Sequence, residues 1–136
     1  MSDDKEETLE TAKRRNAGPR IGAELEERTL VFAVRLLAFV NTLPNTVAGR
    51  TIGGQTLASG TSVGANYREA NRAESKADFT HKIAIALKES AEIEYWLLVC
   101  ERSALGAVPE ALALRTEAGE FVRIFSAINR KARALR

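Results

Sequence analysis

The stretch from Ser75 to Cys100 constrains the fold most, because its apolar residues recur alternately every four and every three positions. An α-helix brings such positions onto one narrow strip, as in a helix that packs against partner helices in a bundle. We expect Ser75 to cap this helix and Asp78 to place a favourable negative charge in its first turn. The strip consists of Phe79, Ile83, Ala86, Ser90, Ile93, Leu97 and Cys100. Four more apolar residues flank it and need cover of their own: Ile85, Tyr95, Trp96 and Val99.

The remaining sequence favours helices as well. A chain of 136 residues suits one domain, and a sheet would need alternating apolar and polar runs, which are missing here. We predict further helices from about residue 23 or 24 to 43, from 46 to 73, and from 109 to 131 or beyond, with Pro44 and Gly106 as stops. Short turns then predict an all-α, antiparallel up-down-up-down four-helix bundle with left-handed packing over residues 23–136. Residues 1–22 show no helical stripe and are expected to form a disordered tail.

The first helix has more apolar surface than one strip can hide. One face carries Leu25, Thr29, Phe32, Leu36, Val40 and Leu43, and the surface is widened by Val31, Val34, Leu37 and Phe39. Between Arg28 and Arg50 the only charged residue is Arg35. This surplus predicts contact with another subunit, and the alternative is that the additional residues fill a wide core.

The second helix is rich in glycine, which costs roughly 0.5–1 kcal/mol per internal position relative to alanine. Gly53, Leu57, Gly60 and Gly64 fall on one helical face, which predicts a close approach to another helix. A phosphate-binding loop is disfavoured, because neither Gly-Lys-Ser/Thr nor G-x-G-x-x-G occurs here.

Positive charge gathers at the end of a chain whose formal net charge is only +2. From residue 123 onward there is no acidic residue, and the cations are Arg123, Arg130, Lys131, Arg133 and Arg136. Arg68 and Arg72 in the second helix are further candidates. These cations either suit the negative end of a helix dipole or bind the phosphates of RNA or DNA. If these cations bind phosphates, an oligomer would present several copies of this basic surface.

Several classes of function lack the residues they need. Cys100 is the only cysteine, so no intrachain disulfide can form, and a free thiol suits a reducing compartment. No stretch resembles a signal peptide or membrane span, so we expect a soluble, cytoplasmic protein. A dimetal carboxylate site would need two Glu-x-x-His pairs, but His81 is the only histidine. We therefore predict no catalytic residue, no metal and no cofactor.

A longer set of residues resembles a known family. The continuous run from Gln55 to Ala70 is followed by Ser75–Phe79, Lys82-Ile83, Ala86–Ser90, Glu92 and Tyr95-Trp96-Leu97, with Arg28-Thr29, Phe32-Ala33 and Leu43-Pro44 before it. Over most of residues 24–130 the chain thereby resembles the four-helix bundle proteins of the 23S rRNA intervening-sequence family. The resemblance implies a ring-like homopentamer with no established catalytic activity. A related branch is the accessory variability protein of diversity-generating retroelements, whose basic pentamer binds nucleic acid and a reverse transcriptase.

Five polar or aromatic residues within the matched region are candidates for interface positions: Asn66, Glu69, Glu89, Glu92 and Trp96. Glu89 and Glu92 are three residues apart and share one side of a helix, with Trp96 one turn further. We expect these residues to make interhelical hydrogen bonds and ion pairs or a subunit contact, since an unpaired buried carboxylate is costly.

Two functional hypotheses follow from the sequence. One is a non-enzymatic homo-oligomer that binds RNA or DNA through basic surfaces. The other is a scaffold that binds another protein, with no role for nucleic acid.

Overall fold

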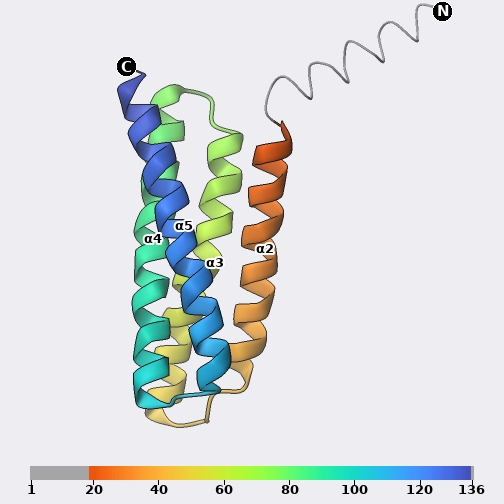
Figure 1. Ribbon diagram of the computed structural model, residues 1–136, viewed down its shortest axis with the longest axis vertical. Coiled ribbons are helices and arrows are strands. Elements are labelled where there is room, and N and C mark those ends of the chain that lie inside the picture. The colour runs from red at the N-terminus through yellow and green to blue at the C-terminus, as the bar shows by residue number, and fades with distance from the viewer. Residues whose placement is uncertain (1–18, 136) are drawn as a thin grey trace, which may run out of the picture.

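Four α-helices run side by side along one long axis (Figure 1). The computed structural model describes residues 19–135, in which the helices are α2 (Pro19–Asn41), α3 (Val47–Asn71), α4 (Lys76–Ser103) and α5 (Val108–Ala134). This part of the chain contains no strand. The predicted all-α bundle of four helices is confirmed. The predicted tail, up to residue 18, lies outside the described residues.

Each helix packs against the next one in the chain, and α2 also packs against α5. The α4 helix packs closely along both α3 and α5, whereas α2 contacts α3 more extensively than α5. The backbones of α2 and α4 do not approach each other, and neither do those of α3 and α5, so each of these pairs lies diagonally across the bundle. The start of α2, the α3–α4 turn and the end of α5 share one end of the molecule, which we call the upper end as in Figure 1.

The α4 helix has the cap and the buried strip that its sequence predicts. The Ser75 hydroxyl accepts a hydrogen bond from the backbone N–H of Asp78 at 3.0 Å, which satisfies one of the free donors of the first turn. Ile83, Ala86, Ser90, Ile93, Leu97 and Cys100 are all fully buried, and Phe79 is half-buried at the upper end. The 4-3 spacing therefore identifies the core-facing side of this helix correctly.

Two helix boundaries differ from their predicted positions. The α2 helix begins at Pro19, four residues before the expected start, because the missing N–H of proline costs nothing in the first turn. The α4 helix ends at Ser103, and its C-cap is not Gly106 but Ala104, which takes the left-handed conformation with φ 53°. Gly106 follows at φ 82° in the turn into α5, where a side chain would also collide with Leu43.

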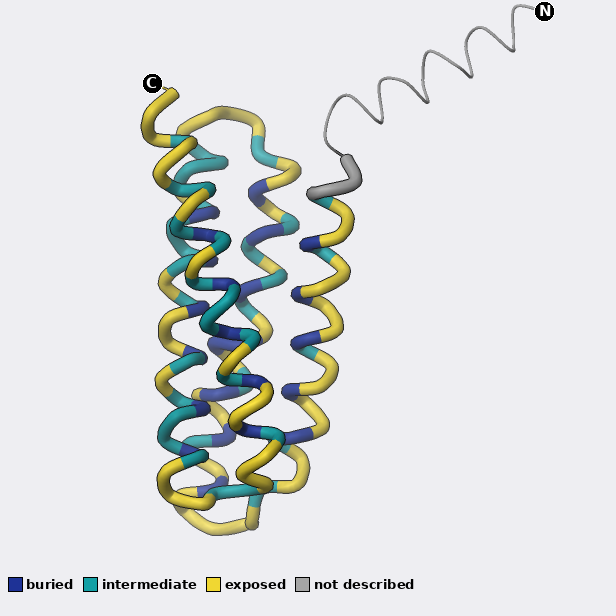
Figure 2. Tube along the Cα trace, in the orientation of Figure 1, coloured by how far each residue is buried: buried dark blue, intermediate teal, exposed yellow. Residues whose placement is uncertain are grey.

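The core lies along the axis of the bundle, between the strips of all four helices (Figure 2). Phe32 of α2 packs edge-on against Phe121 of α5, with ring centroids 5.3 Å apart, and Tyr67 of α3 packs against Phe125 at 5.5 Å. For Phe39, the alternative that the additional apolar residues of α2 fill a wide core holds, since it is only 3% exposed. Its ring faces the α4–α5 turn, where Gly106 lies against it.

The glycines of α3 allow α2 and α3 to approach closely, as predicted. A Cβ atom added to Gly60 would overlap the side chain of Leu36, and one added to Gly64 would lie 2.9 Å from the Thr29 hydroxyl. A Cβ on Gly53 would be within 3.3 Å of both Val40 and Leu43. At Gly60 and Gly64 a side chain would need space that the side chains of α2 occupy.

Candidate nucleic-acid interface

The predicted basic residues come from two helices and meet at the upper end of the bundle. Arg130, Lys131 and Arg133 are exposed on the last two turns of α5. Arg72 is the exposed C-cap of α3, and Lys76 starts α4 beside it in the chain. Both helix ends lie at the same end of the molecule in Figure 1. Cations that are about half the chain apart in sequence therefore share one end of the bundle; Arg136 lies outside the described residues.

These cations differ in whether a nearby carboxylate pairs with them. Arg123 is paired with Glu120 at 2.5 Å, and this hydrogen bond raises the pKa of Arg123 and lowers that of Glu120. Arg68 lies 3.8 Å from Glu26 of α2. In contrast, Arg130 and Lys131 form no ion pair with any residue in the 19–135 range. The last turns of α5 thus keep cations available for an anionic partner.

Acidic residues at the same end limit the field of this patch. Glu26 accepts a hydrogen bond from Asn71 at 2.8 Å and lies beside Arg68, so it neutralises part of the α3 contribution. Glu69 is paired with Lys82 at 3.1 Å. The cationic surface is therefore strongest on α5, whose sequence carries no carboxylate after Glu120.

The candidate interface residues follow the seam between α3 and α4. The Glu69–Lys82 ion pair joins the two helices, as expected for an interhelical contact. Glu89 and Trp96 follow Lys82 at intervals of seven residues, so they lie on the flank of α4 that faces α3. The side-chain amide of Asn66 donates to the Ser62 carbonyl within α3, at 2.8 Å, so this bond does not join two helices.

Glu89 and Glu92 form no ion pair with any described side chain. Burial and then the negative charge of Glu92 raise the pKa of Glu89 above its usual value. The indole Nε1–H of Trp96 is buried and has no hydrogen-bond acceptor within the described part of the chain. The Trp96 ring packs edge-on against Tyr95, with centroids 5.1 Å apart. The middle of the α3–α4 seam is therefore less well satisfied than its upper end.

The outward side of α2 is apolar. Leu30, Val31, Val34 and Leu37 are between 44% and 61% exposed. Val31, Val34 and Leu37 belong to the apolar surplus expected from the sequence, whereas Leu30 was not among the expected residues. The sequence does indicate Leu30, since Leu30, Val34 and Leu37 are spaced by four and three residues and therefore share one side of the helix.

Two ion pairs between α2 and α5 were also missed. Arg28 donates two hydrogen bonds to Glu117, at 2.6 and 2.8 Å, and its guanidinium lies 5.5 Å from the Phe121 ring centroid. Arg35 donates to Glu110 at 2.9 Å. The two arginines, Arg28 and Arg35, are seven positions apart, and so are the two glutamates, Glu110 and Glu117. Opposite charges that share this heptad spacing on two helices are the sequence signal for such ion pairs.

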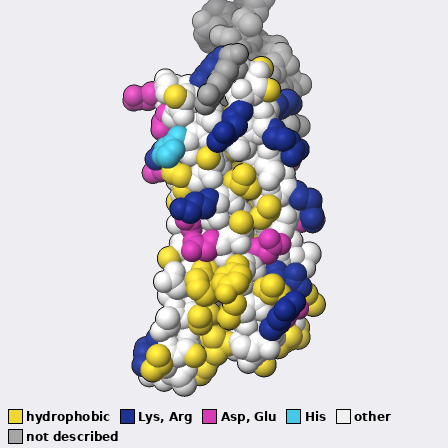
Figure 3. Space-filling model, turned by 90° about the vertical axis from the view of Figure 1, so that its left-hand side faces the viewer, with side chains coloured by type: hydrophobic (Ala, Val, Ile, Leu, Met, Phe, Trp, Pro, Cys, Tyr) yellow, Lys and Arg dark blue, Asp and Glu magenta, His cyan; other side chains and the backbone are white. Residues whose placement is uncertain are grey.

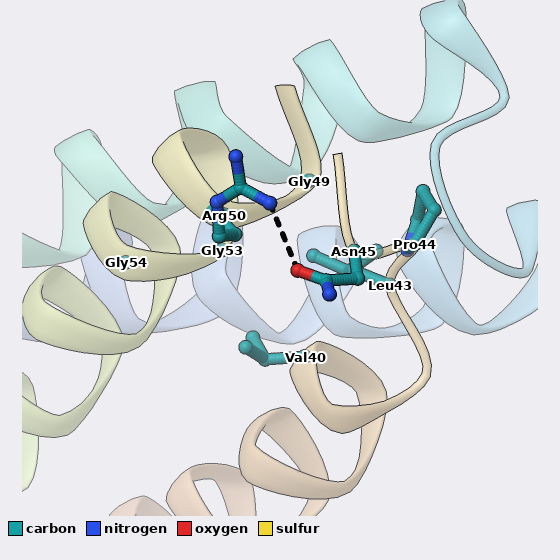
Figure 4. A pocket seen from close by; sticks show the side chains of 8 residues that line it. All are labelled: Val40, Leu43, Pro44, Asn45, Gly49, Arg50, Gly53 and Gly54. Carbon is teal, nitrogen blue, oxygen red and sulfur yellow. Dashed lines mark hydrogen bonds between the residues drawn. The ribbon is translucent and has the colours of Figure 1, made fainter. Parts of the chain in front are cut away.

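A small cavity of about 210 Å³ lies at the lower end, at the α2–α3 turn (Figure 4). Its walls are Val40, Leu43, Pro44, Asn45, Gly49, Arg50, Gly53 and Gly54. The Arg50 guanidinium donates to the Asn45 side chain at 2.9 Å. The only ionisable side chain in its wall is this arginine, so the cavity offers no acid–base pair for catalysis.

The described residues form neither a metal-ligand cluster nor a membrane-spanning helix. Within residues 19–135, no three His, Cys, Asp or Glu side chains come together as ligands for a metal ion. None of the helices described is both long enough and apolar enough to cross a bilayer. Cys100 is buried, which raises the pKa of its thiol.

Comparison with known proteins identifies relatives of the chain. The family model of the 23S rRNA-intervening sequence protein matches residues 24–127. A crystal structure of a protein of unknown function from the S23 ribosomal protein family, from Bacteroides thetaiotaomicron VPI-5482, is 36% identical. That match covers 76% of this chain and 96% of the other, with a TM-score of 0.70. None of the curated proteins is a significant match.

Proposed function

This chain belongs to the 23S rRNA-intervening sequence protein family, and from that premise we propose that it is a non-enzymatic, self-associating bundle that binds RNA or DNA. The phosphates would contact the basic upper end of each copy. A cytoplasmic location is part of the proposal and is supported by the single free thiol of Cys100.

The proposal includes an antiparallel, left-handed arrangement of the helices. Contacts between neighbours occur in opposite order along the two sequences, which supports antiparallel packing. Leu36 lies beside Gly60, whereas the earlier Thr29 lies beside the later Gly64. The 4-3 spacing of the buried strip in α4 supports left-handed packing, because this spacing keeps a strip facing its partners only if helices supercoil to the left.

Self-association is supported by the apolar outward side of α2. Leu30, Val34 and Leu37 are exposed together on one helix, and contiguous exposed apolar surface of this kind is typical of interaction sites. The resemblance to the family implies that the assembly is a homopentamer. Such an assembly would carry several copies of the basic end.

The observation that carries nucleic-acid binding is the position of Arg130 and Lys131. Both are exposed and without a carboxylate partner in the described chain, and they share the upper end with Arg72. Binding to phosphate releases counterions, and several linked copies of a weak patch bind far more tightly than one. Because few aromatic side chains accompany these cations, we propose contact with the backbone and not stacking on bases.

The test is a titration of the assembled protein with a 23S rRNA fragment and with duplex DNA. We expect affinity to fall by about tenfold or more when salt is raised from about 50 to about 200 mM. The double variant Arg130→Ala, Lys131→Ala should weaken binding and flatten the salt dependence. The matched control, Arg50→Ala with Arg102→Ala, removes two exposed cations from the lower end and should bind as well as the wild type. Absence of binding at low salt would refute the nucleic-acid role.

A scaffold for another protein is the second candidate. It is favoured by the α3–α4 seam, where the Trp96 indole N–H has no acceptor and Glu89 has no ion pair within residues 19–135. A reverse transcriptase is the partner that the resemblance implies. Binding of such a protein by variants that have lost nucleic-acid binding would favour this candidate.

A further inference from the structure

Negative charge is concentrated in one short part of the sequence, which precedes the described residues. Residues 3–10, which we call the acidic segment, contain five carboxylates and only one cation, Lys5. No other run of eight residues in the chain is as strongly negative. The carboxylates are those of Asp3, Asp4, Glu6, Glu7 and Glu10.

The chain enters the bundle at the end where cations are exposed. The α2 helix begins at Pro19 at the upper end, and α5 finishes there with Arg130, Lys131 and Arg133. Figure 3, seen from the side of α4, shows Lys and Arg side chains over the upper half and hydrophobic side chains mainly in the lower half. α2 and α5 are also direct neighbours in the bundle. The acidic segment is therefore attached close to the basic end of α5.

The connection between the acidic segment and the bundle is long enough for contact with α5. It consists of the eight residues 11–18. Eight extended residues span up to about 26–29 Å, whereas the axes of neighbouring helices are about 8–10 Å apart. A connection of this length keeps two groups at an effective concentration in the millimolar range. Individually weak ion pairs then suffice to hold the segment against the end of α5 in the same copy.

Charges on the other elements at the upper end favour α5 as the partner. An acidic segment is repelled by the first turns of α2, which carry Glu24, Glu26 and Glu27. These glutamates suit instead the Lys-Arg-Arg run of residues 13–15, which lies between the acidic segment and the bundle in sequence. On α5, no carboxylate follows Glu120, and Arg130 and Lys131 form no ion pair within the described chain. The end of α5 thus offers the opposite charge.

We propose that the acidic segment binds the exposed cations at the end of α5 in the same copy and competes there with phosphate groups. The contact follows from the charges and the connection described above, and only the competition rests on the proposed nucleic-acid binding. The carboxylates of the segment take the place of phosphates on Arg130 and Lys131. Nucleic acid must displace the segment before it binds, which lowers its apparent affinity.

Disulfide trapping tests the contact without nucleic acid. The variant Thr8→Cys, Ala134→Cys places one thiol in the acidic segment and one on the exposed end of α5, while the native Cys100 is buried. After addition of a mild oxidant, we expect the disulfide within one copy to form about threefold or more faster at about 50 mM salt than at about 500 mM, because salt screens exposed charges.

The matched control for trapping has the same two cysteines and a neutral segment. In this neutral segment the five carboxylates are replaced by amides, through Asp3→Asn, Asp4→Asn, Glu6→Gln, Glu7→Gln and Glu10→Gln. The length of the connection is unchanged, so the control measures how often the two thiols meet without attraction between charges. It should form the disulfide slowly at both salt concentrations.

A double-mutant cycle tests the competition. In the wild-type background, the neutral segment should raise the affinity for duplex DNA about three- to tenfold at about 50 mM salt, because phosphates no longer have to displace it. In the Arg130→Ala, Lys131→Ala background the same change should raise the affinity much less, since the cations that the segment occupies are absent. A general effect of removing negative charge would be equal in the two backgrounds.

The outcomes separate this inference from the proposed function. Equal trapping rates for the acidic and the neutral segment, or a disulfide found only between copies, would overturn the contact. An equal gain in both backgrounds of the cycle would overturn the competition for Arg130 and Lys131. Absence of nucleic-acid binding by every variant at low salt would refute the proposed function and the competition with it, while the trapping rates would still decide the contact.

Discussion

Gly60 of α3 lies so close to Leu36 of α2 that a single added carbon on Gly60 would overlap the leucine side chain. Leu36 is fully buried and cannot swing into solvent to make room. The contact fixes the distance between α2 and α3 at the middle of the bundle, and its consequences can be measured.

The substitution Gly60→Leu should lower the free energy of unfolding by about 1–3 kcal/mol, because the larger side chain overpacks the contact between α2 and α3. Chemical denaturation followed by circular dichroism measures this change. Gly54→Leu is the matched control, since nothing lies within 4 Å of a Cβ at Gly54. That variant should be unchanged or more stable, by up to about 1 kcal/mol, because leucine is the better helix former. Equal stability of both variants would contradict the close approach.

The substitution Val34→Lys should dissociate the assembly and leave the monomer folded. Val34 is 61% exposed, so a lysine there is tolerated in one copy but would place a charge in the proposed contact. Light scattering should show a mass closer to 14.8 kDa, with unchanged helicity. Thr116→Lys, at an exposed position of α5, is the control and should assemble normally. An intact assembly in Val34→Lys protein would exclude the apolar outward side of α2 as the interface.

The substitution Ser75→Ala should lower stability by about 0.5–2 kcal/mol, because it removes the acceptor for the Asp78 N–H at the start of α4. Thermal unfolding provides the measurement. Ser103→Ala removes a hydroxyl that only bonds the Val99 carbonyl in the last turn, and it should have little effect. If Ser75→Ala protein melts with the wild type, the cap does not contribute to stability.

The substitution Glu89→Gln should change how stability depends on pH. Burial and the charge of Glu92 raise the pKa of Glu89 in the folded protein, so the folded state holds this proton more tightly than the unfolded chain does. The contribution of Glu89 to stability is therefore greatest below the usual carboxyl value of about 4.3 and declines as pH rises through the raised value. Urea unfolding should show the variant gaining stability over the wild type as pH rises from about 4 to neutrality. A course of Glu89→Gln protein that runs parallel to the wild type at every pH would contradict the raised pKa of Glu89.

Much of the candidate interface could be located in the sequence but not assembled from it. Arg72 and Arg130 are both recognisable as exposed cations near helix ends, yet only the path of the helices brings them to the same end of the molecule. The pairing of Arg68 with Glu26 depends in the same way on which helices are neighbours. The hydrogen bond of Asn66 within its own helix could not be distinguished from an interhelical one, because both leave the same sequence pattern.

The sequence by itself determined the four helices and the buried side of α4, because the spacing of apolar residues along one helix reports directly on which side faces the core. Tertiary structure alone decided that Phe39 is buried and that Arg28 and Arg35 meet carboxylates of α5. These features depend on how each helix is rotated about its axis and which helix lies next to it. The spacing of residues within a single helix reports neither the rotation of that helix nor its neighbour, since both are set only when four helices pack around one core.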